Sequence, residues 1–155
     1  MNQHPDTPGD LSKDRLRVWL RMLKVTRMIE AELRERLRQE WDTTLPRFDV
    51  MSALHRNGEG MKMSDLSGVL RVSNGNVTGI VDRLVADGLV ERRTVEGDRR
   101  AMRVVLTPKG RTLFDEMAAV HEAWVDELLS PIGAQGLATV YSRLGRIAEQ
   151  TEEDS

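Results

Sequence analysis

Residues 61–107 read MKMSDLSGVLRVSNGNVTGIVDRLVADGLVERRTVEGDRRAMRVVLT. Apolar residues recur every three or four positions over 63–70 and 74–86, which predicts two helices joined by a three-residue turn. The period then changes to two over 89–95 and 101–106, the alternation typical of β-strands. The loop between these strands is short and contains a glycine, so the segment ends in a predicted β-hairpin.

A further helix precedes this segment. Pro46 suits its first turn, because the N–H that proline lacks would be unpaired there, and Asn57-Gly58 ends it. Ser64 is the expected cap of the next helix. The order helix, helix, short turn, helix and hairpin is that of a winged helix-turn-helix. A helix about 10–12 Å across fits the DNA major groove, which is about 12 Å wide, so this order predicts a DNA-reading element.

The start of the helix predicted over 74–86 is small and polar. Small residues let the backbone approach DNA, and asparagine can pair bidentately with adenine. The free N–H groups and the positive dipole at a helix N-terminus also favour phosphate binding. The candidate DNA contacts here are Ser73, Asn74, Asn76 and Thr78. The same residue types also suit a turn followed by a helix cap, and that alternative stays open.

The loop of the predicted hairpin is charged. It contains Asp98, Arg99 and Arg100. An arginine on a rigid support can enter a minor groove, where the electrostatic potential is negative. An aspartate suits DNA poorly, so we interpret Asp98 as a brace that orients an arginine through a salt bridge. A solvated charged loop is the alternative interpretation.

The flanking regions predict long helices. Residues 11–40 carry two apolar stripes at helical spacing, with Ser12 as the expected N-cap. Two stripes need cover on two sides, and a chain of 155 residues with 4% aromatic residues offers too little partner surface of its own. Residues 108–150 predict two more helices with apolar stripes, separated by a proline. We therefore expect both regions to be dimerisation helices.

The predicted fold class is mainly α (α+β), a winged helix-turn-helix with long N- and C-terminal dimerisation helices. We expect one integrated domain, with the DNA-binding region over 46–107 and a disordered arm over 1–10. The arm lacks the basic start and apolar stretch of a signal peptide. No apolar run approaches the roughly 20 residues that a membrane helix needs. The expected location is the cytoplasm.

The distribution of charge matters more than its total. The net charge of −2 counts mildly against a nucleic-acid binder, whose balance is often basic. However, the phosphate field acts only over about one Debye length, roughly 8–10 Å. Residues 92–111 hold seven basic side chains and two acidic ones, and acidic residues gather toward the C-terminus. This asymmetry predicts one basic face and one acidic end.

The sequence predicts no enzyme, metal site or cofactor. His4, His55 and His121 are far apart, and there is no nucleophile elbow or phosphate loop. The absence of cysteine excludes disulfides, thiolate metal sites and thiol-based sensing. The alternative function is a helical protein-interaction adaptor that kept the fold without DNA binding. Salt-dependent binding to mixed-sequence DNA separates this adaptor from a DNA-binding regulator.

The end of the hairpin carries a family resemblance. The residues concerned are Asp98, Arg100, Leu106, Thr107 and Gly110. Their spacing resembles the wing signature of the multiple-antibiotic-resistance-regulator (MarR) family, and the likeness covers about residues 11–148. It implies a sequence-specific transcriptional regulator, a homodimer with interlocking terminal helices. It further implies that the protein binds a pseudo-palindromic operator in double-stranded DNA, usually as a repressor.

The resemblance also assigns roles to single residues. It implies that Arg100 enters the minor groove, that Asp98 braces it and that Arg83 holds a phosphate. Many members release DNA when a small aromatic effector binds between the dimerisation and DNA-binding regions. The candidate residues for such a pocket are Trp19, Met22, Met51 and His55. Core packing is the alternative role for these four, and an aromatic acid is expected beside Trp19.

Overall fold

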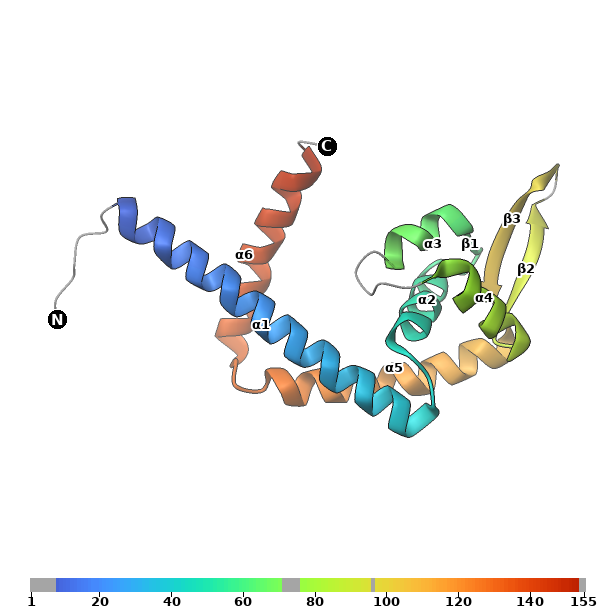
Figure 1. Cartoon of the computed structure of the whole chain (residues 1–155), viewed down its shortest axis with the longest axis horizontal. Coiled ribbons are helices and arrows are strands. Elements are labelled where there is room, and N and C mark those ends of the chain that lie inside the picture. The colour runs from blue at the N-terminus through green and yellow to red at the C-terminus, as the bar shows by residue number, and fades with distance from the viewer. Residues whose placement is uncertain (1–7, 71–75, 96, 154–155) are drawn as a thin grey trace. The chain divides into compact units, whose positions relative to one another are not determined.

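The computed structural model describes residues 8–70, 76–95 and 97–153; the side chains at 8, 95 and 98–101 are outside this description. The chain divides into two compact units, residues 1–120 and 121–155. The elements of the described part (Figure 1) are α1 (Pro8–Trp41), α2 (Leu45–Arg56), β1 (Met61–Lys62), α3 (Met63–Leu70), α4 (Val77–Ala86), β2 (Val90–Val95), β3 (Asp98–Leu106), α5 (Pro108–Leu129) and α6 (Ala134–Glu153).

Helix α1 is longer than the sequence predicts. It begins at Pro8 rather than at Leu11, so the last three residues of the expected arm are helical. Ser12 therefore lies inside the helix, and its expected role as the N-cap is wrong. A proline in the first turn costs no intrahelical hydrogen bond, which allows the earlier start. The helix ends at Trp41, one residue beyond the predicted end.

The helix-turn-helix region is built from short helices. Thr44 adopts an extended conformation before α2, and its hydroxyl accepts the Arg47 N–H at 3.3 Å. Pro46 lies in the first turn, as predicted. Helix α3 has the predicted bounds, but Ser64 follows its first residue and is not its cap. Capping replaces the intrahelical partners that the first N–H groups lack, so α2 gains a defined start.

Helix α4 starts later than predicted because Asn76 is its cap. Asn76 has an extended backbone, and its side-chain oxygen accepts the Gly79 N–H at 3.3 Å. The predicted first helical residue, Asn74, lies outside the described residues. At the other end Gly88 adopts a left-handed conformation (φ +73°), as its position after the helix predicts.

The core of the first unit lies among the end of α1, α2, α3, α4, the sheet and the first half of α5. Its most deeply buried large side chains are Leu37, Met51, Leu54, Leu66, Leu84, Met117, Val50, Val81, Val90 and Val104. The rings of Phe48 and Phe114 pack with their centroids 5.4 Å apart. Among the described residues no polar or charged side chain is buried. Apolar burial at about 25 cal/mol per Å² therefore holds this unit together.

The sheet has the strand order β1-β3-β2, with antiparallel pairing throughout. Arg92 stands opposite Val104, and the register shifts after Thr94. The short strand β1 was not predicted, because two residues are too few to show a period. It follows Gly60, whose φ of +95° and whose close approach to the Val104 carbonyl leave no room for a side chain.

The second unit contains the end of α5 and helix α6. Helix α5 ends at Leu129, just before Pro131, as predicted. In α6 the large apolar residues are exposed; they are Leu137, Val140, Tyr141, Leu144 and Ile147. Burial lowers the pKa of His121. Within the described residues, none of the helices combines the length and apolar character that crossing a bilayer requires.

Candidate nucleic-acid interface

Helix α4 presents one buried and one exposed face. Val81 and Leu84 are buried, whereas Thr78, Asp82 and Arg83 are exposed. Thr78 and Asp82 are four residues apart and therefore lie on the same side of the helix. The predicted contacts Thr78 and Arg83 are thus accessible from outside. The exposed face is polar and holds one acidic side chain, which sequence reasoning overlooked.

The N-terminus of α4 contains the predicted contact Asn76. This side chain is exposed, and its oxygen caps the helix. The cap interpretation therefore holds for Asn76. Its amide nitrogen is a separate donor, which capping by the oxygen leaves available for an outside acceptor. The other two predicted contacts at this end, Ser73 and Asn74, lie outside the described residues.

Strands β2 and β3 form a two-stranded extension beyond α4 (Figure 1). This pair of strands is called the arm from here on. At its tip Val95 pairs with Asp98, and Gly97 has a φ of +86°. The backbone of Asp98, Arg99 and Arg100 belongs to β3, so these residues lie at the start of a strand rather than in a loop. Their side chains are outside the described part, and their roles stay predictions.

An ion pair connects the arm to α4, the predicted DNA-reading helix. Arg92 of β2 binds the carboxylate of Asp82 on α4. The sequence pattern does not reveal this contact, because it depends on how a strand and a helix pack. The adjacent Arg93 makes a different pair, with Glu91 of the same strand. Neighbouring arginines of the arm thus have partners on different elements.

The base of the arm is fixed to the end of α4. The Thr107 hydroxyl donates to the Gly88 carbonyl at 2.7 Å and accepts the Gly110 N–H at 3.0 Å. A Cβ added to Gly110 would lie 1.9 Å from the Leu89 carbonyl oxygen. Lys109 donates to the Asp87 carbonyl at 2.9 Å. Packing at the base of the arm therefore accounts for the residue types at the Thr107 and Gly110 positions of the wing signature.

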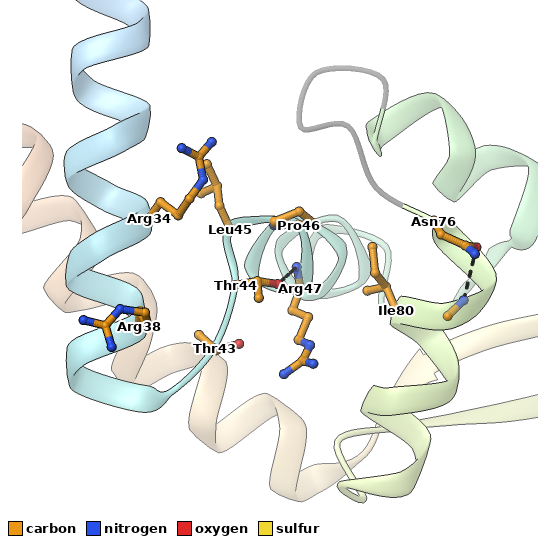
Figure 2. A pocket seen from close by; sticks show the side chains of 10 residues that line it. Arg34, Arg38, Thr43, Thr44, Leu45, Pro46, Arg47, Asn76 and Ile80 are labelled. Carbon is orange, nitrogen blue, oxygen red and sulfur yellow. Dashed lines mark hydrogen bonds between the residues drawn. The ribbon is translucent and has the colours of Figure 1, made fainter.

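A cavity of about 690 Å³ lies between the end of α1, the start of α2 and the start of α4 (Figure 2). It is lined by Arg34, Arg38, Thr43, Thr44, Leu45, Pro46, Arg47, Asn76, Gly79 and Ile80. Three lining residues are arginines and none is acidic. In the described part of the chain, Arg34 and Arg47 have no carboxylate partner, while the hydrogen bond that Arg38 donates to Glu35 raises the pKa of Arg38. Sequence reasoning did not find this cavity.

The four predicted pocket residues do not share one wall. Met51 is buried and lines a second cavity of about 520 Å³, together with Trp41. Trp19 is exposed and Met22 is half-buried on α1. His55 bonds through Nε2 to Asp115 Oδ1 at 3.0 Å and packs on Phe114 with ring centroids 4.9 Å apart. The lining of this second cavity includes only Met51 of the four.

Known proteins resemble this arrangement. A model of the MarR family matches residues 41–101. YfiV of Bacillus subtilis strain 168, an uncharacterized HTH-type transcriptional regulator, is 30% identical over 150 residues, which are 93% of this chain and 91% of YfiV. The chain belongs to the MarR family.

Two solved structures from this MarR family extend the comparison. A family regulator from Silicibacter pomeroyi has 33% identity and a TM-score of 0.75, with 91% of this chain and 98% of that chain covered. A MarR variant from E. coli, solved in complex with operator DNA, has 27% identity and a TM-score of 0.72, with 89% and 98% covered. Both confirm the mainly helical winged helix-turn-helix. As a MarR family member the chain is a DNA-binding transcriptional regulator and not an enzyme.

Proposed function

We propose that this regulator is a homodimeric repressor that binds a pseudo-palindromic operator and releases it when a small ligand binds. The exposed outer face of α4 carries the proposal, because it lies beside an arm that is fixed at its base by Thr107. In a dimer, two copies of α4 and its arm would be related by a two-fold axis. Their reading helices would then be about 34–36 Å apart, one turn of DNA. Each helix would then enter a successive major groove on the same side of the duplex.

The proposed DNA contacts divide between two grooves. Ser73, Asn74, Asn76 and Thr78 would line the major groove. Because its oxygen caps α4, Asn76 would use its amide nitrogen as the donor. Arg83 would bind a phosphate, whereas Arg99 and Arg100 would reach the minor groove with Asp98 as their brace. Asparagine and arginine supply the geometry that base edges and narrow grooves require.

The proposed dimer rests on apolar side chains that the chain itself leaves exposed. In α1 these are Leu11, Leu16, Val18, Trp19, Leu20, Val25 and Met28. In α6 Tyr141 is 85% exposed, and its apolar neighbours along the helix are exposed as well. Surfaces of this kind, with polar surroundings, mark protein interaction sites. A second copy of the chain would cover both helices, and two-fold pairing is the commonest arrangement among oligomers.

The proposed ligand is an amphipathic anion in the cavity beside α4. Arg34, Arg38 and Arg47 supply positive charge, and a forked guanidinium suits a carboxylate. Leu45, Pro46 and Ile80 line the same cavity and would contact an apolar body. Because Asn76, Gly79 and Ile80 belong to the start of the reading helix, an occupant would act directly on it. An aromatic acid beside Trp19 stays a separate prediction.

Selection of genomic DNA fragments by the full-length protein tests DNA recognition. We expect the bound fragments to share an inverted repeat whose half-sites are about 10 base pairs apart. Affinity should fall steeply with rising salt, since each neutralised phosphate releases counterions. If no fragment is enriched and binding to mixed-sequence DNA does not depend on salt, the chain is better described as a helical adaptor.

A series of aromatic carboxylates tests the ligand. They should weaken operator binding by the wild-type protein and lose most of this effect on the Arg47→Ala variant. Arg17→Ala is the matched control, because Arg17 lies on α1, is exposed and is not part of the cavity lining. If the acids change neither operator affinity nor tryptophan fluorescence in the wild type, this ligand class is wrong.

A further inference from the structure

The reading helix carries a carboxylate where DNA phosphates would approach. Asp82 is four residues after Thr78, on the exposed side of α4, and its side chain is 58% exposed. A negative charge here would repel the phosphate backbone, because that field extends over roughly 8–10 Å at physiological salt. Unless its negative charge is neutralised, Asp82 opposes contact between DNA and the exposed face of α4, for which the other side chains of that face are suited.

Arg92 provides this neutralisation. It stands opposite Val104 in the register, so its side chain leaves the sheet on the same face as the buried Val90 and Val104. From this face its guanidinium binds Asp82, and the side chain is only 32% exposed. Arg93 lies on the opposite face of the strand, where Glu91 is its partner. The alternation of the strand therefore assigns only Arg92 to the reading helix.

We propose that the Arg92–Asp82 pair is a positioning contact that sets DNA specificity, on the basis of the proposed DNA-binding function. The pair removes the repulsive charge from the exposed face of α4. It also connects the arm to the reading helix at a point beyond the contacts of Thr107 at the base. An arm fixed at two points meets the neighbouring groove at a defined angle, whereas one fixed only at its base can adapt to many sequences.

The proposal predicts opposite effects on mixed-sequence DNA binding when each member of the pair is removed. Removal of Arg92 leaves Asp82 unpaired, so binding to operator and to mixed-sequence DNA should both weaken. Removal of the Asp82 charge instead frees Arg92 for a phosphate. Mixed-sequence binding should then strengthen, and the slope of log affinity against log salt should steepen by about one per protomer. Specificity, the ratio of the two affinities, should fall in both variants.

A double-mutant cycle on the full-length protein tests the proposal. The variants are Arg92→Ala, Asp82→Asn and their combination, with thermal unfolding measured for each. We expect Arg92→Ala to reduce operator affinity about 10-fold, and the double variant to differ from additivity by at least about 5-fold, as contacting residues do. Asp82→Asn alone should raise mixed-sequence affinity about 3-fold without changing the unfolding temperature, because exposed ion pairs contribute little to stability.

The pair of Arg93 and Glu91 is the matched control. Arg93→Ala and Glu91→Gln remove a guanidinium and a carboxylate from an ion pair within β2, and specificity should change little in either variant, because this pair lies within one strand. Additive effects at Arg92 and Asp82, or an Asp82→Asn protein that binds mixed-sequence DNA no better than wild type, would overturn the proposal. Failure of the wild-type protein to bind any DNA would instead overturn the proposed function, so the two failures are distinguishable.

Discussion

The winged region (α2 to β3) and the terminal helices (α1 and α6) carry apolar residues at the same helical spacing, but the two regions differ in how far these residues are exposed. In α4 Val81 and Leu84 are 0% and 1% exposed, covered by the rest of the first unit. On α1 Leu20 is 55% exposed, and on α6 Ile147 is 57% exposed. Periodicity therefore identifies a face that needs cover, but the partner that covers it must be found elsewhere. The winged region provides its own partner, whereas the terminal helices leave apolar residues exposed, and we propose that a second chain covers them.

An aspartate introduced into each region tests this difference with the largest effect. Leu20→Asp should leave the protomer folded and prevent dimerisation, so operator affinity should fall by roughly 10²–10⁴, the gain that two linked heads provide. Leu84→Asp buries a charge and should unfold the winged region. Sedimentation and circular dichroism report the two outcomes. The surface variant Lys24→Asp controls for the added charge on α1, and a Leu20→Asp protein that is still dimeric contradicts the assignment.

Gly110→Ala should produce the next largest effect, a loss of stability in the first unit. The new Cβ would overlap the Leu89 carbonyl, so α5 and the turn after α4 must move apart. Overpacking of this kind costs about 1–3 kcal/mol, and backbone overlap belongs at the upper end. Chemical denaturation measures the loss. Gly145→Ala is the control, because nothing lies near an added Cβ there; equal stabilities of the two variants would contradict the described packing.

Arg100→Ala should affect recognition without affecting either fold or dimer. If Arg100 enters the minor groove, its loss weakens operator binding by about 1–3 kcal/mol. Electrophoretic mobility shift or fluorescence anisotropy measures the change, and the unfolding curve should match that of the wild type. Arg111→Ala, an exposed arginine on α5, is the matched control. Equal operator affinity of wild type and Arg100→Ala would refute the wing assignment.

The pH dependence of the second unit should be the smallest effect. Burial lowers the pKa of His121 below its ordinary value of 6.5. Below about pH 6.5 the unfolded chain therefore binds a proton that the folded chain does not, and stability falls as the pH falls toward the lowered pKa. His121→Gln should flatten this slope in denaturation curves recorded between pH 5 and 7. An unchanged slope would show that His121 does not titrate in this way.

The sequence predicted those parts of the fold that depend on local patterns. The bounds of α3 follow from helical spacing, and the left-handed Gly88 follows from its position after α4. The first residues of α1 and the two-residue strand β1 were missed, since neither has a period or a clear stop signal. Local chemistry thus specifies elements well and their ends less well.

The candidate site could be predicted only in part. Asn76 and Thr78 were predicted as DNA contacts because a small polar segment begins a helix after a short turn; both are exposed, and their contact with DNA stays a prediction. The Arg92–Asp82 pair and the arginine-lined cavity were missed, because both join elements whose packing the sequence pattern does not reveal. Charge at a known position is visible in a sequence, but its partner depends on register and tertiary contact.

Hydroxyl-radical footprinting on the selected operator tests most directly whether two reading heads of a symmetric pair lie on one side of the duplex. For the wild-type protein we predict two protected backbone segments about 10 base pairs apart on one side of the duplex, each flanked by a protected minor groove. Arg100→Ala should lose the flanking protection and keep the central segments. A single protected segment, or flanks unchanged in the variant, would contradict the account.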